Sequence, residues 1–240
     1  VENAVRDLKR QGAKQLIFDL RNNTGGLLFQ AIEICNFFIS KDKVVVSTRG
    51  KVSDWNKEYK SQKDPLDKDI ALIILTNEMS ASASEIVSGV LQDYDRAVVI
   101  GQNTYGKGLV QSTFETAYNS KVKVTTAKYY IPSGRCIQEI DYGKKDEEGR
   151  SPDIPDSLRT EFHTACGRAV FDGKGIAPDI KMKKDTLDEF ILSLGANDVF
   201  FDYAVHYFYT HKDSAPESPT SFQFSHEKFN DFLKWYKTKD

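Results

Sequence analysis

The sequence has few of the residues that build disulfide-bonded or metal-stabilised folds. Among its 240 residues are only three cysteines and four histidines, and neither set has the spacing of a disulfide framework or a zinc site. We therefore expect no metal and no structural disulfide, and we place Cys35, which lies in an apolar helical pattern, in the core. The residues concerned are Cys35, Cys136, Cys166, His163, His206, His211 and His226.

Long runs of one charge or of apolar residues are also missing. The formal net charge is −2 and no long basic stretch appears, which argues against nucleic acid as a partner. No apolar stretch has the length of a membrane span, and no signal peptide is recognisable. Because the chain starts inside a helical pattern over residues 1–11, we expect it to be a piece of a longer protein.

What the sequence does contain is typical of an α/β protein. Hydrophobic residues make up 40% of the chain, enough for a sizeable core in one or two domains. Helical periodicity alternates with short apolar or alternating stretches, which favours strands between helices. Helices are predicted at 1–11, 27–40 and before Tyr94, and strands at 14–20, 44–46, 71–75, 97–100, 109–114 and 121–131.

Two polar stretches and a C-terminal region complete this prediction. Residues 51–68 are expected to form a surface loop or flap that gates access, and residues 141–156 a flexible loop. Residues 183–240 have helical periodicity with aromatic stripes typical of packing faces. There, Thr186 and Glu189 form a capping box, Gly195 is a C-cap, and residues 214–220 form a linker.

The rest of the chain is organised around residues 76–111. Ser82 stands where a predicted strand leads directly into a predicted helix, and the first N–H groups of a helix together with its dipole suit a developing oxyanion. A serine at this point is well placed to attack a carbonyl. The structural alternative is that Ser82 and Glu85 form a capping box, and that Ser80, Ser82 and Ser84 only cap and solubilise the helix end.

Lys107 lies between two glycines directly after the next predicted strand. Glycines on both sides let the backbone approach closely, so the ammonium group can fold inward. A buried lysine without a neighbouring carboxylate has a lowered pKa and can act as the general base for a serine. The commoner alternative is a solvated lysine in a glycine loop.

The same loop has the spacing of a phosphate-binding loop, from Gly101 to Gly106-Lys107. However, Gly108 stands where a magnesium-binding Ser or Thr is required, and the following residues, 109–114, have the pattern of a strand instead of a helix. Nucleotide binding is therefore strongly discounted.

Several of these motifs, in this order over about 130 residues, resemble the carboxyl-terminal processing peptidases, also called tail-specific serine proteases. They are the Ser-Ala-Ser-Ala-Ser-Glu-Ile run from Ser80, the Leu-Gln-Asp helix end, Arg-Ala-Val-Val-Ile-Gly, Tyr-Gly-Lys-Gly-Leu-Val-Gln from Tyr105, Asp-Leu-Arg-Asn-Asn-Thr-Gly-Gly from Asp19, Tyr-Tyr-Ile-Pro-Ser-Gly and Gly-Ile-Ala-Pro-Asp. The resemblance implies that Ser82 is the nucleophile, Lys107 the general base, and Gln111 the residue that orients this lysine. Because four residues of a flat strand span about 13 Å, the connection between Lys107 and Gln111 has to curl.

The resemblance also implies an oxyanion hole. Ala83 matches one backbone donor, and the Gly25-Gly26 turn matches the other, with the choice between the two glycines left open. A turn that merely joins a strand to a helix is the alternative for this glycine pair. No cofactor is implied.

The expected fold is α/β, a crotonase/ClpP-like mixed sheet core with flanking helices over residues 1–182, followed by a C-terminal helical appendage over residues 183–240. The implied activity is a serine endopeptidase that cleaves proteins or peptides with apolar C-termini, in the periplasm or cell envelope. The family usually has a PDZ domain before this core, and nothing before Val1 supplies one. A catalytically silent peptide-binding module on the same fold is the alternative.

Overall fold

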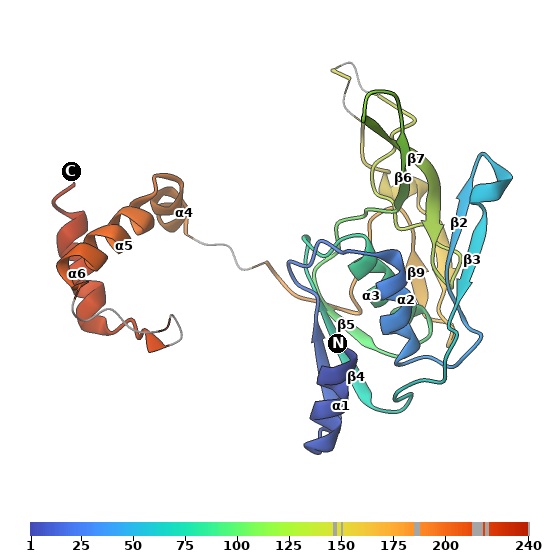
Figure 1. The fold of residues 1–240 in the computed structure, drawn as a ribbon, viewed down its shortest axis with the longest axis horizontal. Helices are drawn as coiled ribbons and strands as arrows, with labels where there is room; N and C mark the ends of the chain where they lie inside the picture. The colour runs from blue at the N-terminus through green and yellow to red at the C-terminus, as the bar shows by residue number, and fades with distance from the viewer. Residues whose placement is uncertain (146–147, 150, 185–187, 213–217, 219–220, 240) are drawn as a thin grey trace. The chain divides into compact units, whose positions relative to one another are not determined.

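The computed structural model describes residues 1–145, 148–149, 151–184, 188–212, 218 and 221–239. These residues form two compact units, Val1–Lys183 and Lys184–Asp240, drawn as a ribbon in Figure 1. The first unit contains all the sheets of the described chain, and the second consists of helices. The motifs around Ser82 therefore lie in the first unit.

A parallel four-stranded sheet forms one side of the first unit. Its strands follow one another in the order β1-β4-β5-β10, and each pair of neighbours is parallel. Parallel neighbours have their carboxyl ends at the same edge of the sheet, so the segments that follow β1 and β4 meet there. The strands are β1 (Gln15–Asp19), β4 (Ala71–Thr76), β5 (Val98–Gly101) and β10 (Ile180–Lys181).

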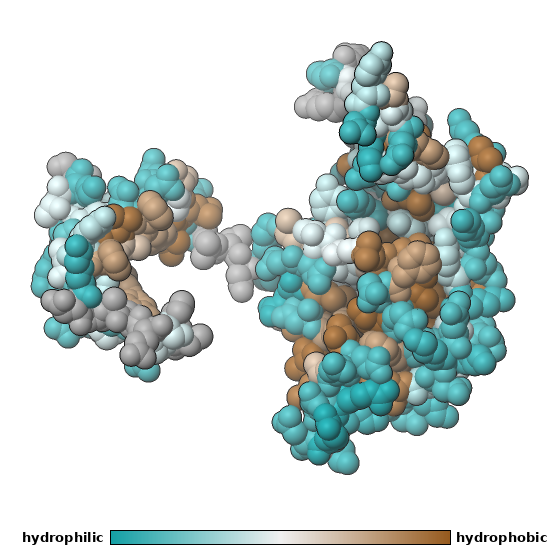
Figure 2. Space-filling model, viewed as in Figure 1, coloured by the Kyte–Doolittle hydropathy of each residue, from teal (hydrophilic) through white to brown (hydrophobic). Residues whose placement is uncertain are grey.

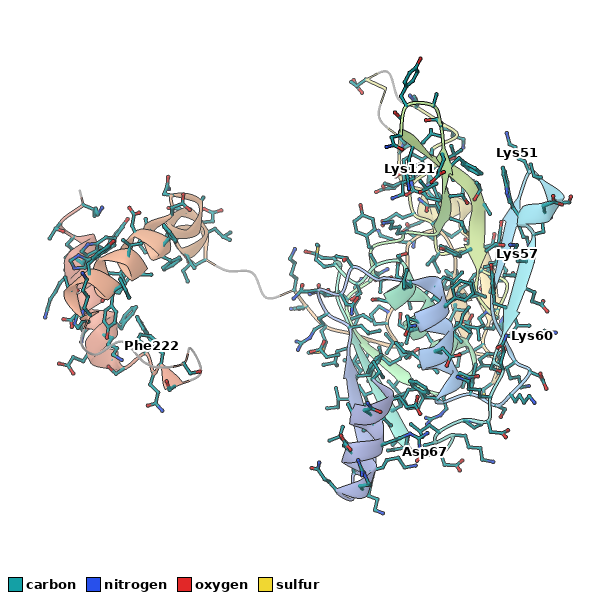
Figure 3. The ribbon with its side chains drawn as sticks, viewed as in Figure 1. Lys51, Lys57, Lys60, Asp67, Lys121 and Phe222 are labelled. Carbon is teal, nitrogen blue, oxygen red and sulfur yellow. The ribbon has the colours of Figure 1, made fainter. Side chains whose placement is uncertain are left out.

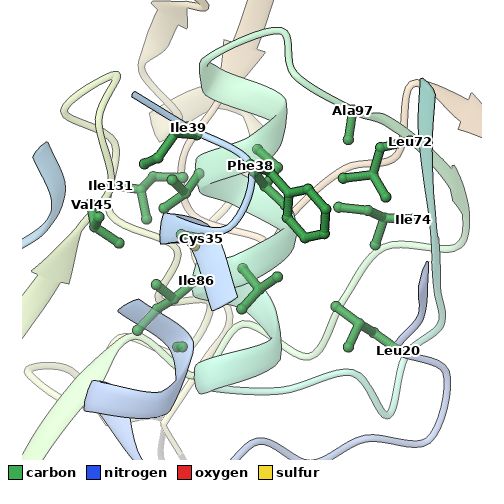
Figure 4. Packing of buried hydrophobic residues seen from close by; sticks show 14 of the residues in the cluster. Leu20, Cys35, Phe38, Ile39, Val45, Leu72, Ile74, Ile86, Ala97 and Ile131 are labelled. Carbon is green, nitrogen blue, oxygen red and sulfur yellow. The ribbon is translucent and has the colours of Figure 1, made fainter. Parts of the chain in front are cut away.

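The helices α2 (Leu28–Asn36) and α3 (Ala83–Asp93) pack against this sheet, after a first helix α1 (Glu2–Arg10). Their apolar residues join alternate strand residues in one core cluster, part of which is shown in Figure 4. Cys35 is fully buried in this cluster, which confirms its expected place in the core. Every residue of α3 is buried, so the helix that begins beside Ser82 is fixed by packing along its whole length.

A second, antiparallel sheet has the order β3-β2-β7-β6. Core residues of β2 join the same cluster as α2 and α3, which lie between the two sheets in Figure 1. β6 is an edge strand in this sheet, and it begins directly after the loop that contains Lys107. The strands are β2 (Val44–Gly50), β3 (Lys57–Lys60), β6 (Leu109–Glu115) and β7 (Lys121–Tyr130).

The segment 51–68, expected to be a surface loop or flap, contains regular structure that the sequence did not predict. Strand β3 and a short 3-10 helix, η1 (Ser53–Trp55), interrupt this segment, and β3 pairs with β2. Tyr59 explains the difference, because its ring packs against the core and meets Phe29 edge-on at 6.1 Å. The remaining short elements are η2 (Asp156–Leu158) and the antiparallel pair β8 (Glu161–His163) and β9 (Ala169–Phe171).

The α/β class is confirmed, but the pairing differs in one respect from a single mixed sheet. Parallel and antiparallel pairings occur in separate sheets. The connections from β1 to β4 and from β4 to β5 contain the helices α2 and α3, whereas β2 and β3, and β6 and β7, are joined by short connections that suit antiparallel pairing.

The second unit contains α4 (Glu189–Ala196), α5 (Val199–Thr210) and α6 (His226–Tyr236) around a small aromatic core. The side chain of Asp188 caps α4 by accepting a hydrogen bond from the Phe190 N–H at 2.8 Å. Gly195 lies inside α4 instead of ending it, since the helix continues to Asn197 as its C-cap. Thr186 and most of the expected linker at 214–220 lie outside the described residues.

The structure also bears on the membrane and metal expectations. In the described ranges, no helix is both long and apolar enough to cross a lipid bilayer. The same part of the chain holds no group of three or more His, Cys, Asp or Glu side chains that could bind a metal ion.

Candidate active site

Ser82 occupies a strained turn between β4 and α3. Its φ of 56° and ψ of −114° lie in a region that residues with a side chain rarely adopt. Such backbone strain persists only where the surroundings impose it, and it concentrates at functional sites. The serine is half-buried, and Ala83 directly after it is the first residue of α3. Ser82 therefore stands at the positive end of a helix in a conformation that its neighbours enforce.

The neighbours that hold this turn come from the loop after β1. The buried Ser80 hydroxyl donates to the Leu20 carbonyl at 2.7 Å, and the Ala81 N–H donates to the Asn23 carbonyl at 3.0 Å. The Ser84 hydroxyl donates to Oδ1 of Asn23 at 2.9 Å. Ser80 and Ser84 thus join the two loops at the carboxyl edge of the parallel sheet, and they do not serve as solvated helix caps.

Gly25 packs directly against the serine turn. A Cβ atom at this position would lie 2.6 Å from the Ala81 carbonyl oxygen, 2.9 Å from the Ala83 nitrogen and 3.0 Å from the Ser82 Cβ, and its φ of +99° favours glycine. A Cβ atom on Gly26 would meet nothing within 4 Å. The close approach to the turn thus belongs to Gly25.

The backbone donors around the turn are not equally available. The Gly25 N–H is engaged by Oδ1 of Asn23 at 3.0 Å. Within the described part of the chain, the N–H groups of Gly26 and Ala83 donate to no protein acceptor. The first N–H groups of a helix have no partner inside the helix, so the Ala83 N–H is open to an external acceptor.

Glu85 links the serine turn to the lysine loop. This role goes beyond the capping box that the sequence predicts for Ser82 and Glu85. The residue is fully buried. Its Oε2 accepts hydrogen bonds from the Ser82 N–H at 2.7 Å and the Lys107 N–H at 2.9 Å. Because one oxygen binds both groups, the backbone nitrogens of Ser82 and Lys107 are neighbours.

The other carboxylate oxygen of Glu85 binds the same loop. Its Oε1 accepts from the Thr104 hydroxyl and the Gly106 N–H, both at 2.6 Å. Burial raises the pKa of the Glu85 carboxyl above its ordinary value, and the four donated hydrogen bonds oppose this rise. The capping-box pattern could locate Glu85, but its bonds to residues 104–107 depend on a long-range contact that spacing does not reveal.

Lys107 is an exposed residue, which agrees with the alternative of a solvated lysine in a glycine loop. The glycines beside it are buried instead, and they let the loop backbone come close to residues 138 and 139. A Cβ atom on Gly106 would lie 2.5 Å from the Glu139 Cβ, and one on Gly108 would lie 2.6 Å from the Gln138 nitrogen. The close approach predicted from the glycines is therefore made by the backbone, and the side chain of Lys107 remains exposed.

Lys107 and Gln111 line the same cavity, which has a volume of about 1070 Å³. The expected curl is visible as a register shift between Val110 and Gln111 in the pairing of β6 with β7. Ser82 does not line this cavity, and in the described residues no hydrogen bond joins the Ser82 side chain to Lys107. The structure brings Ser82, Ala83 and Gly25 together in one place and Lys107 and Gln111 in another, with Glu85 between them.

The loop lacks the features of a nucleotide site. Strand β6 begins at Leu109, where a phosphate-binding loop would start a helix. The Gly108 N–H donates to Oε1 of Gln138 at 2.9 Å, so this donor is occupied. Both observations argue against a phosphate-binding loop.

Comparisons with known proteins agree with the motifs. The family model described as Peptidase family S41 matches residues 1–155, and the model of the C-terminal helical domain of a probable PDZ-protease matches residues 190–240. A probable CtpA-like serine protease of Staphylococcus aureus (strain COL) is 41% identical over 157 residues, which are 64% of this chain and 29% of that protein. The carboxy-terminal-processing protease of Bartonella bacilliformis is 39% identical over 158 residues, with 64% and 34% covered.

A solved structure of a processing protease is also similar to this chain. The photosystem II D1 C-terminal processing protease superposes with a TM-score of 0.57 at 26% identity, over 78% of this chain and 39% of that one. The chain thus spans about a third of the length of these relatives. Since the family model covers well over half of the sequence, the chain belongs to peptidase family S41.

Proposed function

We propose that this chain is the catalytic part of a serine endopeptidase that cleaves protein substrates near their C-termini, with a crotonase-like core in residues 1–182 and a helical region in 183–240. The observation that carries the proposal is the shared Oε2 of Glu85, which holds the backbones of Ser82 and Lys107 beside each other. The strained φ of Ser82 and the open N–H of Ala83 support it. The S41 relatives are named as serine or C-terminal processing proteases, which also supports the proposal.

In the proposed reaction, Ser82 Oγ attacks the scissile carbonyl carbon while neutral Lys107 takes the hydroxyl proton. The oxyanion is held by the Ala83 N–H and by a donor of the Gly25-Gly26 turn, for which Gly26 has the open N–H. Lys107 then returns the proton to the leaving amine, and an acyl-enzyme forms on Ser82. Water, activated by Lys107, hydrolyses this ester and regenerates both residues.

Lys107 reaches Ser82 only if its side chain turns out of the cavity. Its four-carbon stem is flexible, and catalytic hydrogen bonds often tighten only when substrate is bound. Gln111 lines the same cavity, and its proposed role is to orient Lys107 by a hydrogen bond. We place the substrates among proteins with apolar C-termini and the activity in the periplasm or cell envelope, both on the family resemblance. No cofactor is needed.

Covalent labelling with a fluorophosphonate tests the nucleophile. We expect mass spectrometry to find the label on Ser82, slower labelling in Lys107→Ala, and none in Ser82→Ala. Ser53→Ala changes an exposed serine on η1 and is the matched control. A folded parent chain that takes no label at Ser82 would contradict the proposal and would favour a silent binding module.

A further inference from the structure

The cavity that contains Lys107 is strongly cationic. Arg49, Lys51 and Lys128 also line it, and they come from β2, from the residue after it, and from β7. Figure 3 shows Lys51 beyond the end of β2 and Lys57 on the neighbouring strand β3. Three basic side chains thus converge on one cavity beside Lys107, the proposed base.

Two of these cations lie side by side on neighbouring strands of the sheet. Arg49 pairs with Lys128 in the register of β2 with β7, and Lys128 pairs with Leu109 in the register of β7 with β6. Directly opposed residues project from the same face of a sheet, and like charges in this position are destabilising. The Arg49 guanidinium lies over the Tyr130 ring at 4.4 Å, which helps to fix its position. An arrangement that costs stability is understandable if a ligand supplies the missing negative charge.

The protein itself does not supply that charge among the residues described. None of Arg49, Lys51, Lys107 and Lys128 forms an ion pair there. The acidic residue of the cavity lining is Asp141, whose Oδ1 accepts the Gly143 N–H at 3.0 Å and whose Oδ2 lies 3.6 Å from the Lys144 ammonium. The carboxylate of Asp141 is thus engaged on its own loop, and the cavity has excess positive charge.

Apolar side chains form part of the cavity wall. Trp55, Leu109, Ile140 and Tyr142 belong to its lining. Gly50 lets Trp55 approach, because a Cβ atom at Gly50 would lie 3.3 Å from the Trp55 Cβ. A ligand that fits this lining combines apolar side chains with an anionic group.

We infer that the cavity binds a carboxylate of the polypeptide substrate, either the free α-carboxylate of an apolar C-terminus or an acidic side chain near the scissile bond. The inference rests on the proposed function, since the cavity shares Lys107 with the proposed catalytic pair. Arg49 and Lys128 hold the carboxylate, and the apolar part of the wall binds the residue that carries it. Arginine is suited to this task by its two parallel N–H donors.

Binding of three fluorescent peptides with one apolar sequence tests the inference. The first has a free α-carboxylate, the second an amidated C-terminus, and the third an amidated C-terminus and one internal glutamate. The chain with Ser82→Ala is used, so that no peptide is cut. We expect the first or third peptide to bind about tenfold more tightly than the second, with a smaller difference at high salt. A preference for the first identifies the α-carboxylate, and a preference for the third the acidic side chain.

Variants in the same background locate the effect. Arg49→Gln and Lys128→Gln should each abolish the carboxylate preference, whereas Lys57→Gln, on the exposed neighbouring strand, should keep it. Equal binding of all three peptides, or an equal loss in Lys57→Gln, overturns the inference. Cleavage of the same peptides by the chain with Ser82 is scored separately. Carboxylate-dependent binding without cleavage would support the carboxylate site and contradict the proposed peptidase activity. Cleavage without a carboxylate preference would support the peptidase activity and contradict the carboxylate site.

Discussion

At the scale of single residues, the candidate site depends on close backbone approaches. Gly25 touches the serine turn so closely that any side chain there would collide with the Ala81 carbonyl and the Ser82 Cβ. The buried carboxylate of Glu85 accepts hydrogen bonds from three backbone N–H groups and one hydroxyl. The placement of Ser82 thus depends on residues that do not react.

Gly25→Ala should abolish the proposed activity, whereas Gly26→Ala should retain it. The added methyl at Gly25 would meet the Ala81 oxygen at 2.6 Å, while the one at Gly26 meets nothing within 4 Å. We expect at least about a 100-fold loss of peptidase rate in Gly25→Ala, with about 1–3 kcal/mol lost in the free energy of unfolding. Rate assays and urea titrations check this. Full activity in Gly25→Ala would show that this contact does not shape the site.

Glu85→Gln should loosen both loops at once. An amide presents one NH₂ group where the carboxylate accepts two hydrogen bonds, so buried N–H donors lose their acceptor. We expect the free energy of unfolding to fall by about 3 kcal/mol and labelling of Ser82 to slow. Glu58→Gln, an exposed glutamate on β3 paired with Lys60, is the control and should change little. Similar urea midpoints for the two variants would contradict the linking role of Glu85.

These residues also show what the sequence can reveal. The family resemblance implied that Ser82, Ala83 and the Gly25-Gly26 turn belong to one site, with the choice between the two glycines left open. The position of the Lys107 side chain was left open, since local spacing cannot tell whether the backbone or the side chain of a glycine-flanked residue is buried. The bonds from Glu85 to residues 104–107 were invisible, because they join segments about twenty residues apart that meet only in the fold.

At the scale of elements, α3 connects the site to the far side of the first unit. Its first turn starts beside Ser82, and at its end Asp93 pairs with Arg135 at 2.9 Å. Both side chains are buried, with exposures of 1% and 0%. Burial raises the pKa of Asp93 and lowers that of Arg135, while each opposes the other's shift by its charge.

Asp93→Asn should be strongly destabilising, because it leaves the buried guanidinium of Arg135 without a counter-charge. We expect a loss of about 3–5 kcal/mol in the free energy of unfolding, measured by urea titration. The control is Glu33→Gln, which removes the exposed pair with Lys63 and should cost less than about 1 kcal/mol. A small effect of Asp93→Asn would mean that solvent or other groups compensate Arg135.

α1 is held by an ion pair whose contribution depends on pH. The Lys9 ammonium contacts the Asp67 carboxylate at 2.6 Å, and this hydrogen bond, with backbone donors, lowers the pKa of Asp67 to about 2. A lowered carboxyl pKa stabilises the fold above the ordinary value of 3.8, and this stabilisation is lost as the pH falls toward 2.

Asp67→Asn should therefore lower the free energy of unfolding by about 1 kcal/mol at pH 7, since solvent screens the pair. The difference from the parent should shrink between about pH 4 and pH 2, and urea titrations across this range measure it. A difference that stays constant with pH would assign the effect to packing instead of charge.

At the scale of the whole molecule, the two units differ in what the sequence revealed. Helices with clear periodicity were predicted correctly in both. The separation of parallel and antiparallel strands into different sheets was not, because strand periodicity does not determine which strands pair. The second unit has an apolar hollow lined by aromatic residues such as Phe200, Tyr207 and Phe232, and Figure 2 shows brown, hydrophobic residues on this unit. The predicted aromatic stripes thus form its core and part of its surface.

The measurement that tests the central claim most directly is degradation of an unstructured protein with an apolar C-terminus. The parent chain is compared with Ser82→Ala and Lys107→Ala, with circular dichroism as the check that each is folded. We predict cleavage by the parent chain and its loss in both variants. Cleavage that persists in folded Ser82→Ala, or in Lys107→Ala at an unchanged rate, would contradict the Ser82–Lys107 mechanism.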